Sequence, residues 1–129
     1  MSVEFLFWAN VWLSVIVNVV LWGFSFFPPK ILVIDKIHMG ARGLALPGLI
    51  LIRRGEPDST LRHEMVHIRQ YRRYTPFGVS CVLAWHYGFG FLRQKMRGEK
   101  LCFWSLWRIN PLEKEANDAM YTSEESEPI

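Results

Sequence analysis

An uncharged apolar run near the N-terminus constrains this 129-residue chain more than any other feature. It extends from Phe5 to Phe27 (FLFWANVWLSVIVNVVLWGFSFF) and contains no Asp, Glu, Lys or Arg. About 20 such residues in an α-helix cross the hydrocarbon core of a bilayer. The residues before the run include no basic residue, and Phe26 to Pro29 lack the small residues of a signal-peptide cleavage site. We therefore predict a membrane anchor over residues 1–29, with a buried core helix as the alternative.

The orientation of this anchor follows from the positive charges around it. No Lys or Arg precedes the run, whereas Lys30, Lys36, Arg42, Arg53 and Arg54 follow it. Because positive charges favour the cytoplasmic side, we predict a single-pass anchor with the body on the cytoplasmic or an equivalent side.

Basic residues also gather beside later apolar segments, at Arg69, Arg72, Arg73, Arg93, Lys95 and Arg97. No aromatic-basic motif or helix-turn-helix pattern accompanies them, so nucleic acid is not an expected partner. Their apolar neighbours favour contact with anionic lipid headgroups, with ordinary solvated helix faces as the alternative.

The rest of the chain predicts a small α+β domain over residues 30–121, followed by an acidic, disordered tail at 122–129. β-Branched residues predict a strand at Lys30–Ile37 and another at Ala45–Arg53, with Pro47-Gly48 bending or interrupting the second. Expected helices cover Thr60–Tyr74, Pro76–Leu92 and Leu101–Tyr121, the last broken or restarted at Asn110-Pro111. Pro76 ends the first because it disfavours helical geometry at Thr75.

Two further features of this domain have a predicted role. The apolar helix at Pro76–Leu92 is expected to be buried or to lie at the edge of a bilayer, since its length is marginal for a span. Cys81 and Cys102 lie in apolar sequence, so we expect packing residues in a reducing compartment, with no disulfide framework.

The segment from His63 to His67 reads HEMVH, a spacing that matches a zinc site. Residues i and i+4 project from one face of an α-helix, so His63 and His67 can offer imidazole nitrogens to one ion. Glu64 lies beside the first histidine, where it can contact a water on the metal without binding the metal itself. This spacing is the H-E-x-x-H pattern of zinc-dependent proteases.

A catalytic zinc has three protein ligands and an open position for water, so a third ligand is needed. The segment 110–119 (NPLEKEANDA) supplies Glu113 and Glu115, after enough chain for the apolar helix to fold back. These two residues cannot share a helical face, so only one of them can point at the metal. Exposed charges on a helix face are the alternative for both.

The combination of LRHEMVHIRQY, an apolar helix and NPLEKEA resembles gluzincin-type zinc metalloproteases. More closely it is similar to small membrane-associated proteins with H-E-x-x-H-x-x-Q followed by N-P-x-E-x-E-A. The resemblance implies a small gluzincin-like domain with a short β-sheet and two zinc-binding helices, in which Glu113 is the third ligand. The family pattern E-x-x-A-D places Ala116 on its alanine, whereas Asn117 replaces the aspartate that would orient a ligand histidine.

The same resemblance implies peptide hydrolysis, with Glu64 as general base. For the oxyanion the candidates are His86, Tyr87, Arg108 and Tyr121, of which Arg108 is favoured. The strand at Leu49–Arg53 is expected beside the cleft, where it could pair with an extended substrate. Gln70 is expected to make either a packing contact or a substrate contact.

Two other classes of function are consistent with the sequence. One is a structural or accessory subunit of a membrane protein complex, in which zinc only joins two helices. The other is a lipid-binding accessory protein without metal. The expected partners are thus a peptide or protein substrate, membrane lipid and other membrane protein subunits.

Overall fold

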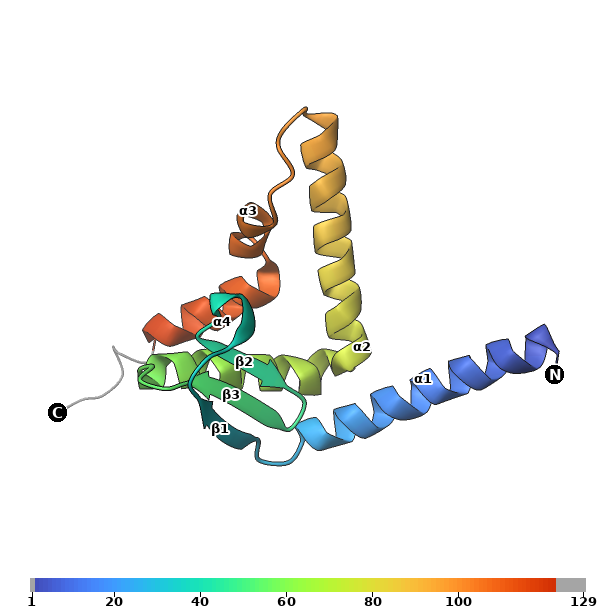
Figure 1. Ribbon diagram of the computed structural model, residues 1–129, viewed down its shortest axis with the longest axis horizontal. Coiled ribbons are helices and arrows are strands. Elements are labelled where there is room, and N and C mark those ends of the chain that lie inside the picture. Colours follow the sequence, from blue (N-terminus) through green and yellow to red (C-terminus); the bar gives the residue numbers. More distant parts are fainter. Residues whose placement is uncertain (1, 123–129) are drawn as a thin grey trace.

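The computed structural model describes residues 2–122, which form an α+β structure with a mostly helical body and a small sheet (Figure 1). The expected tail lies outside the described residues, apart from its first residue. The elements in chain order are α1 (Val3–Ser25), β1 (Lys30–Ile34), the 3-10 turn η1 (His38–Gly40), β2 (Gly43–Leu46), β3 (Leu49–Arg53), α2 (Asp58–Met96), α3 (Phe103–Arg108) and α4 (Pro111–Thr122).

The sheet has three strands in the order β1-β3-β2. β3 is the central strand, parallel to β1 with Lys30 opposite Leu49, and antiparallel to β2 with Leu46 opposite Leu49. Pro47-Gly48 forms the tight turn between β2 and β3, where Gly48 has a φ of 78° that suits glycine. The segment predicted as one strand at 45–53 is therefore interrupted, and forms two strands of a hairpin.

The core lies where this sheet packs on the first part of α2. Residues of β3 alternate, so Ile50 and Ile52 are buried against Ile68 of α2, together with Ala45 of β2. Leu61, Met65 and Tyr71 of α2 border the same cluster. This packing fixes the helical face that carries His63 and His67 next to the edge strand β2.

α2 is bent sharply at Thr75, whose φ of 63° and ψ of 160° are not helical. The hydroxyl of Thr75 accepts a hydrogen bond from the backbone N–H of Gly78 (3.1 Å), and Pro76 follows as the first helical residue. Thr75 thus acts as the N-cap of a second helical segment, which confirms the predicted break. We call residues 76–96 the arm; Figure 1 shows the arm turning away from the first part of α2.

α1 extends away from the sheet and, by length and composition, is apolar enough to cross a membrane. Ser25 is its only buried residue among those described, so the rest of α1 is not covered by the described part of the chain. Its C-terminal end is attached to α2, because the Trp22 indole donates to the Arg72 carbonyl (3.1 Å) and the Arg72 guanidinium donates to the Ser25 carbonyl.

The two cysteines differ from the prediction. Cys81 and Cys102 are free and exposed, so they are not packing residues within the described chain. The apolar sequence around them does not become core because the outer side of the arm has no neighbour in this structure.

Candidate metal centre

Three side chains from two helices converge beside β2. His63 and His67 lie one turn apart on the first part of α2, and Glu113 lies in the first turn of α4. The two Nε2 atoms are 3.2 Å apart. One carboxylate oxygen of Glu113 lies 3.3 Å from the Nε2 of His63, and the other lies 3.3 Å from that of His67. One ligand atom of each residue therefore lies within 4.8 Å of the other two.

These separations fit a small tetrahedral ion. Ligand atoms at about 2.0–2.1 Å from a tetrahedral zinc lie about 3.3–3.4 Å from one another. The two imidazole nitrogens are 3.2 Å apart, and each lies 3.3 Å from a different carboxylate oxygen of Glu113. Two histidines and a glutamate are also the donor set of many catalytic zinc sites. The group His63, His67 and Glu113 can thus hold a metal ion.

Gln70 determines which nitrogen of His67 is available to the ion. The Gln70 amide donates to the Leu112 carbonyl (2.9 Å) and to the Glu115 carboxylate (3.0 Å), so its Oε1 faces the Nδ1 of His67 at 2.8 Å. An amide oxygen is an acceptor, and Nδ1 must therefore carry the proton. In neutral His67 the Nε2 atom then carries no proton, and its lone pair points at the Glu113 carboxylate. Acceptors this close repel one another unless a metal ion or a proton lies between them.

The resemblance assigns the orienting role to an aspartate at position 117, but here Gln70 performs it. Asn117 is exposed on α4. Gln70 is 2% exposed and joins the ligand His67 to two residues of α4. Gln70 therefore makes a packing contact that joins His67 to α4, and it also lines the cleft beside the three side chains.

The start of α4 is positioned by a local cap. The Asn110 side chain accepts from the backbone N–H of Leu112 (3.0 Å), and Pro111 occupies the first helical position. Leu112 and Ala116 are buried on the side of α4 that also carries Glu113. Glu115 is exposed and bonds to Gln70, so it lies outside the group of three ligand atoms.

Glu64 lies beneath this group, against the edge strand β2. It is 5% exposed, and a Cβ added to Gly43 would lie 2.5 Å from its Oε1. Burial raises the pKa of Glu64, and this effect outweighs the opposing influence of His67, His63 and the backbone N–H of Ala45. A raised pKa is what a general base needs in order to pass on a proton that it has accepted.

The charges at the centre are strongly coupled. Burial raises the pKa of Glu113, but hydrogen bonds from His63 and His67 outweigh it and hold that pKa at about 2. Burial lowers the pKa of His67, but the hydrogen bonds to Glu113 and Gln70 raise it above its ordinary value. Near neutral pH the carboxylate is therefore ionised, as a metal ligand must be.

A cleft of about 210 Å³ opens beside the three ligands. Gly43, Leu44 and Ala45 of β2 form one wall. Other lining residues are Tyr71, Val79 and Leu83 of α2, with Trp107 and Asn110 of the segment that leads to α4. The prediction that Leu49–Arg53 borders the cleft is wrong, because β3 is paired on both sides and β2 occupies the edge.

Backbone pairing with a substrate at this edge is restricted. The Ala45 carbonyl already accepts a hydrogen bond from the Tyr71 hydroxyl (3.3 Å), and the N–H of Ala45 faces the Glu64 carboxylate.

The favoured oxyanion residue is placed away from the cleft. Arg108 is exposed at the end of α3 and does not line the cleft. His86 bonds through Nε2 to the Leu106 carbonyl (2.8 Å), and Tyr121 is exposed. The Tyr87 hydroxyl is buried without a hydrogen-bond partner among the described residues, as is the side-chain nitrogen of Asn110, which lines the cleft.

Sequence reasoning missed Gly43 and the cap residue Asn110 as parts of the site. Asn110-Pro111 predicted the helix start but not the place of Asn110 in the cleft, and Gly43 has no sequence pattern that relates it to Glu64. Comparisons with protein-family models, with curated proteins and with solved structures found no match to this chain. The candidate three-ligand metal centre is thus defined by the arrangement of His63, His67 and Glu113 alone.

Proposed function

We propose that this protein is a membrane-anchored zinc peptidase in which His63, His67 and Glu113 hold the ion and Glu64 is the general base. The observation that carries the proposal is the convergence of three ligand atoms within 4.8 Å of one another beside a buried glutamate. The H-E-x-x-H spacing and the resemblance to gluzincins support the same assignment.

When bound, zinc supplies a Lewis acid that lowers the pKa of a water molecule and polarises a carbonyl group. Glu64 takes one proton from the attacking water as its oxygen bonds to the peptide carbonyl carbon. The same carboxyl then delivers that proton to the leaving nitrogen as the C–N bond breaks. Desolvation suits Glu64 to both steps, because its raised pKa reduces the cost of holding the proton between them.

The site chemistry also suits a particular class of substrate. Val79, Leu83 and Trp107 make the wall between the arm and α3 apolar. A peptide with an apolar side chain next to the scissile bond would bury it there. We propose that α1 anchors the protein in a membrane. The rest of the chain then lies on the cytoplasmic or an equivalent side, because the basic residues follow α1 in the sequence.

The decisive experiment uses the full chain in detergent or lipid nanodiscs. We expect zinc at one equivalent by elemental analysis, and cleavage of a peptide library with a preference for apolar residues. Glu64→Gln should retain zinc but lose about 10²–10⁴-fold in activity. Glu99→Gln, at an exposed acid far from the centre, is the matched control. Cleavage that persists in Glu64→Gln would contradict the mechanism.

A structural zinc site in a membrane complex is the second candidate. It is favoured by the engaged backbone of Ala45, which restricts pairing with an extended substrate. X-ray absorption on the zinc-loaded protein separates the two functions. Three protein ligands plus a light-atom solvent ligand fit the peptidase, whereas a fourth protein ligand fits the structural role.

A further inference from the structure

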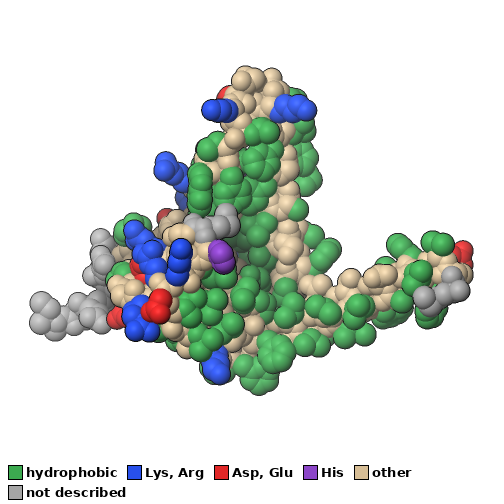
Figure 2. Space-filling view, in the orientation of Figure 1, with side chains coloured by type: hydrophobic (Ala, Val, Ile, Leu, Met, Phe, Trp, Pro, Cys, Tyr) green, Lys and Arg blue, Asp and Glu red, His purple; other side chains and the backbone are tan. Residues whose placement is uncertain are grey.

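The outer face of the arm is a continuous apolar stripe. Residues at intervals of three or four align on one side, at Phe77, Cys81, Trp85, Phe89, Leu92 and Met96. All six are exposed, with Trp85 at 69% and Met96 at 76%. The opposite face is occupied, because Val79 and Leu83 line the metal cleft and Gly90 lies against Leu106 of α3. Figure 2 shows hydrophobic side chains along the arm and basic ones at its tip.

Within α2 the charges beside this stripe have one sign, and just beyond it Glu99 lies 3.8 Å from Arg97. No Asp or Glu occurs between Glu64 and Glu99. The apolar segment is bracketed by the exposed Arg69 and Arg73 just before its foot and by Arg93, Lys95 and Arg97 at its tip. An apolar helical face with basic residues at both ends is complementary to an anionic lipid surface, which offers hydrocarbon between negative headgroups.

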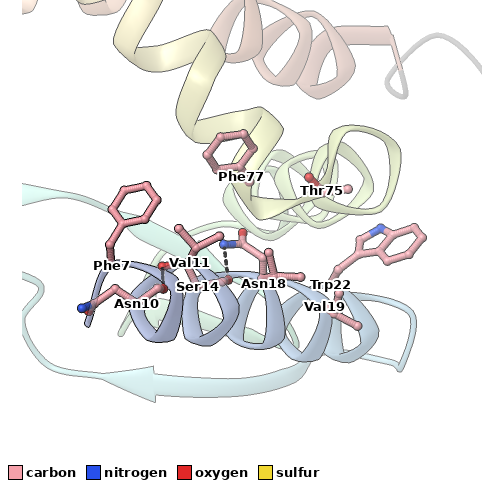
Figure 3. A pocket seen from close by; sticks show the side chains of 10 residues that line it. Phe7, Asn10, Val11, Ser14, Asn18, Val19, Trp22, Thr75 and Phe77 are labelled. Carbon is pink, nitrogen blue, oxygen red and sulfur yellow. Dashed lines mark hydrogen bonds between the residues drawn. The ribbon is translucent and has the colours of Figure 1, made fainter. Parts of the chain in front are cut away.

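This apolar surface continues onto α1. A hollow of about 590 Å³ is lined by α1 residues from Phe7 to Trp22 together with Thr75 and Phe77 at the foot of the arm. In Figure 3 the Phe77 ring projects over the side of α1 that carries Val11 and Ser14. The polar side chains of α1 that line this hollow donate hydrogen bonds to carbonyls of their own helix, as Asn18 does to the carbonyl of Ser14 (3.0 Å). Hydrocarbon can therefore cover both helices.

The two helices run in different directions. In Figure 1 the arm extends across the direction of α1 and does not pack alongside it. If α1 crosses the bilayer, the arm lies along the membrane surface, where its two basic ends can reach the same headgroup layer.

We propose that the outer face of the arm binds an anionic bilayer as an in-plane interfacial helix, on the side where α1 ends. Because the inner face of the arm lines the metal cleft, this docking holds the cleft next to the headgroups. Substrates reached there would be segments of protein close to the membrane. The lipid docking itself stands independently of peptidase activity and is tested without it.

The test uses the full chain with Cys102→Ser, which leaves Cys81 as its only cysteine. A fluorophore on Cys81 is measured in vesicles of phosphatidylcholine with phosphatidylglycerol, using lipids that carry quenchers at different depths. We expect strong quenching at a shallow depth. Phe77→Cys and Met96→Cys, each in a background with both native cysteines changed to Ser, should report the same depth. Lys114→Cys, exposed on α4, is the control and should escape quenching.

Neutralising the tip tests the charge argument. The triple variant Arg93→Gln/Lys95→Gln/Arg97→Gln removes three positive charges. In anionic vesicles, the equilibrium constant between the bilayer-bound and water-exposed states of the Cys81 label should fall by about fivefold for each charge removed. In phosphatidylcholine alone the variant and the parent should agree. Arg62→Gln, on the exposed side of the first part of α2, should have little effect.

Three outcomes would overturn the proposal. If a label at Cys81 is quenched no more than a label at the Lys114→Cys control, the outer face of the arm is exposed to water and does not bind the bilayer. A label at Cys81 that lies much deeper than labels at positions 77 and 96 would indicate a second membrane span. Efficient Cys81–Cys81 disulfide formation in dilute proteoliposomes would indicate that a second copy covers the face.

Discussion

Gly43 is the residue on which the position of Glu64 depends. A side chain at this position would overlap the carboxyl group, since a Cβ would lie 2.7 Å from Cγ and 2.5 Å from Oε1 of Glu64. The three atoms nearest to a Cβ built there all belong to Glu64, whereas the proposed metal ligands are His63, His67 and Glu113. Gly43 thus affects the general base separately from the ion.

Gly43→Ala should therefore reduce kcat and leave zinc binding intact. The methyl group displaces the Glu64 carboxyl, and a displacement of about 1 Å can cost about 10²-fold in rate. Steady-state kinetics with zinc analysis checks this. Gly88→Ala is the control, because nothing lies within 4 Å of a Cβ built there. A parallel loss of zinc would mean that Gly43 supports the whole site.

We expect Gln70 to affect the binding of a metal ion through its hydrogen bond with His67. Gln70→Ala removes the acceptor that holds the proton on Nδ1 and leaves the Leu112 carbonyl without its donor. Loss of such an orienting partner weakens metal affinity about 10–100-fold. Competition with a fluorescent zinc chelator measures the change. Arg69→Ala, at the exposed neighbouring position, should bind zinc like the parent. Unchanged affinity in Gln70→Ala would contradict the orienting role.

Among the elements, α4 determines the third ligand. Its first turn carries Glu113, and the cap at Asn110 fixes where that turn begins. The buried Leu112 and Ala116 fix the rotation of α4 against α2, which directs Glu113 inward and leaves Glu115 at the surface.

Asn110→Ala should lower the free energy of unfolding by about 1 kcal/mol, because the N–H of Leu112 loses its acceptor. Fraying of the first turn should also weaken zinc binding through Glu113. Asn110→Ser keeps an oxygen at the cap position and should recover most of both losses. Chemical unfolding of the metal-free protein, followed by zinc titration of each variant, checks this. Equal effects of Ala and Ser would show that the cap contributes nothing.

At the scale of the molecule, a bound ion would tie α2 to α4 and so stabilise the fold. Stabilisation by a ligand reaches about 2.7 kcal/mol when its free concentration is 100 times its Kd. Zinc and protons compete for the imidazoles, and the raised pKa of His67 favours its proton at higher pH than usual. Glu113, with a pKa of about 2, remains ionised over the pH range in which His67 titrates.

Removal of metal should therefore lower Tm, and the difference in Tm should depend on pH. In the metal-free protein, the stability that protonated His67 contributes is complete below 6.5 and is lost as pH rises through its raised pKa. The stability that zinc contributes has the opposite slope, because it needs the neutral imidazole. We expect the gap between zinc-loaded and chelator-treated protein to widen from pH 6 to pH 8 by differential scanning fluorimetry. A gap that narrows would exclude histidine ligation.

Several features could be predicted because they depend on neighbours in sequence. Pro76 removes a backbone donor and restricts Thr75, so the break in α2 is a local property. Asn110-Pro111 similarly predicts a helix start, and the spacing of His63 and His67 places them on one face of any helix. The length of the apolar run determines that α1 is able to cross a membrane.

The remainder was decided by tertiary packing. No local rule makes Gln70 the partner of His67 and of α4, or brings Gly43 against Glu64, because these contacts depend on how the sheet and two helices pack. The same packing makes β2 the edge strand and leaves Cys81 and Arg108 exposed. The sequence by itself determined the helices, their breaks and the chemistry of their side chains. Only the tertiary structure decided which of these side chains converge, since convergence depends on the rotation and docking of helices far apart in the chain.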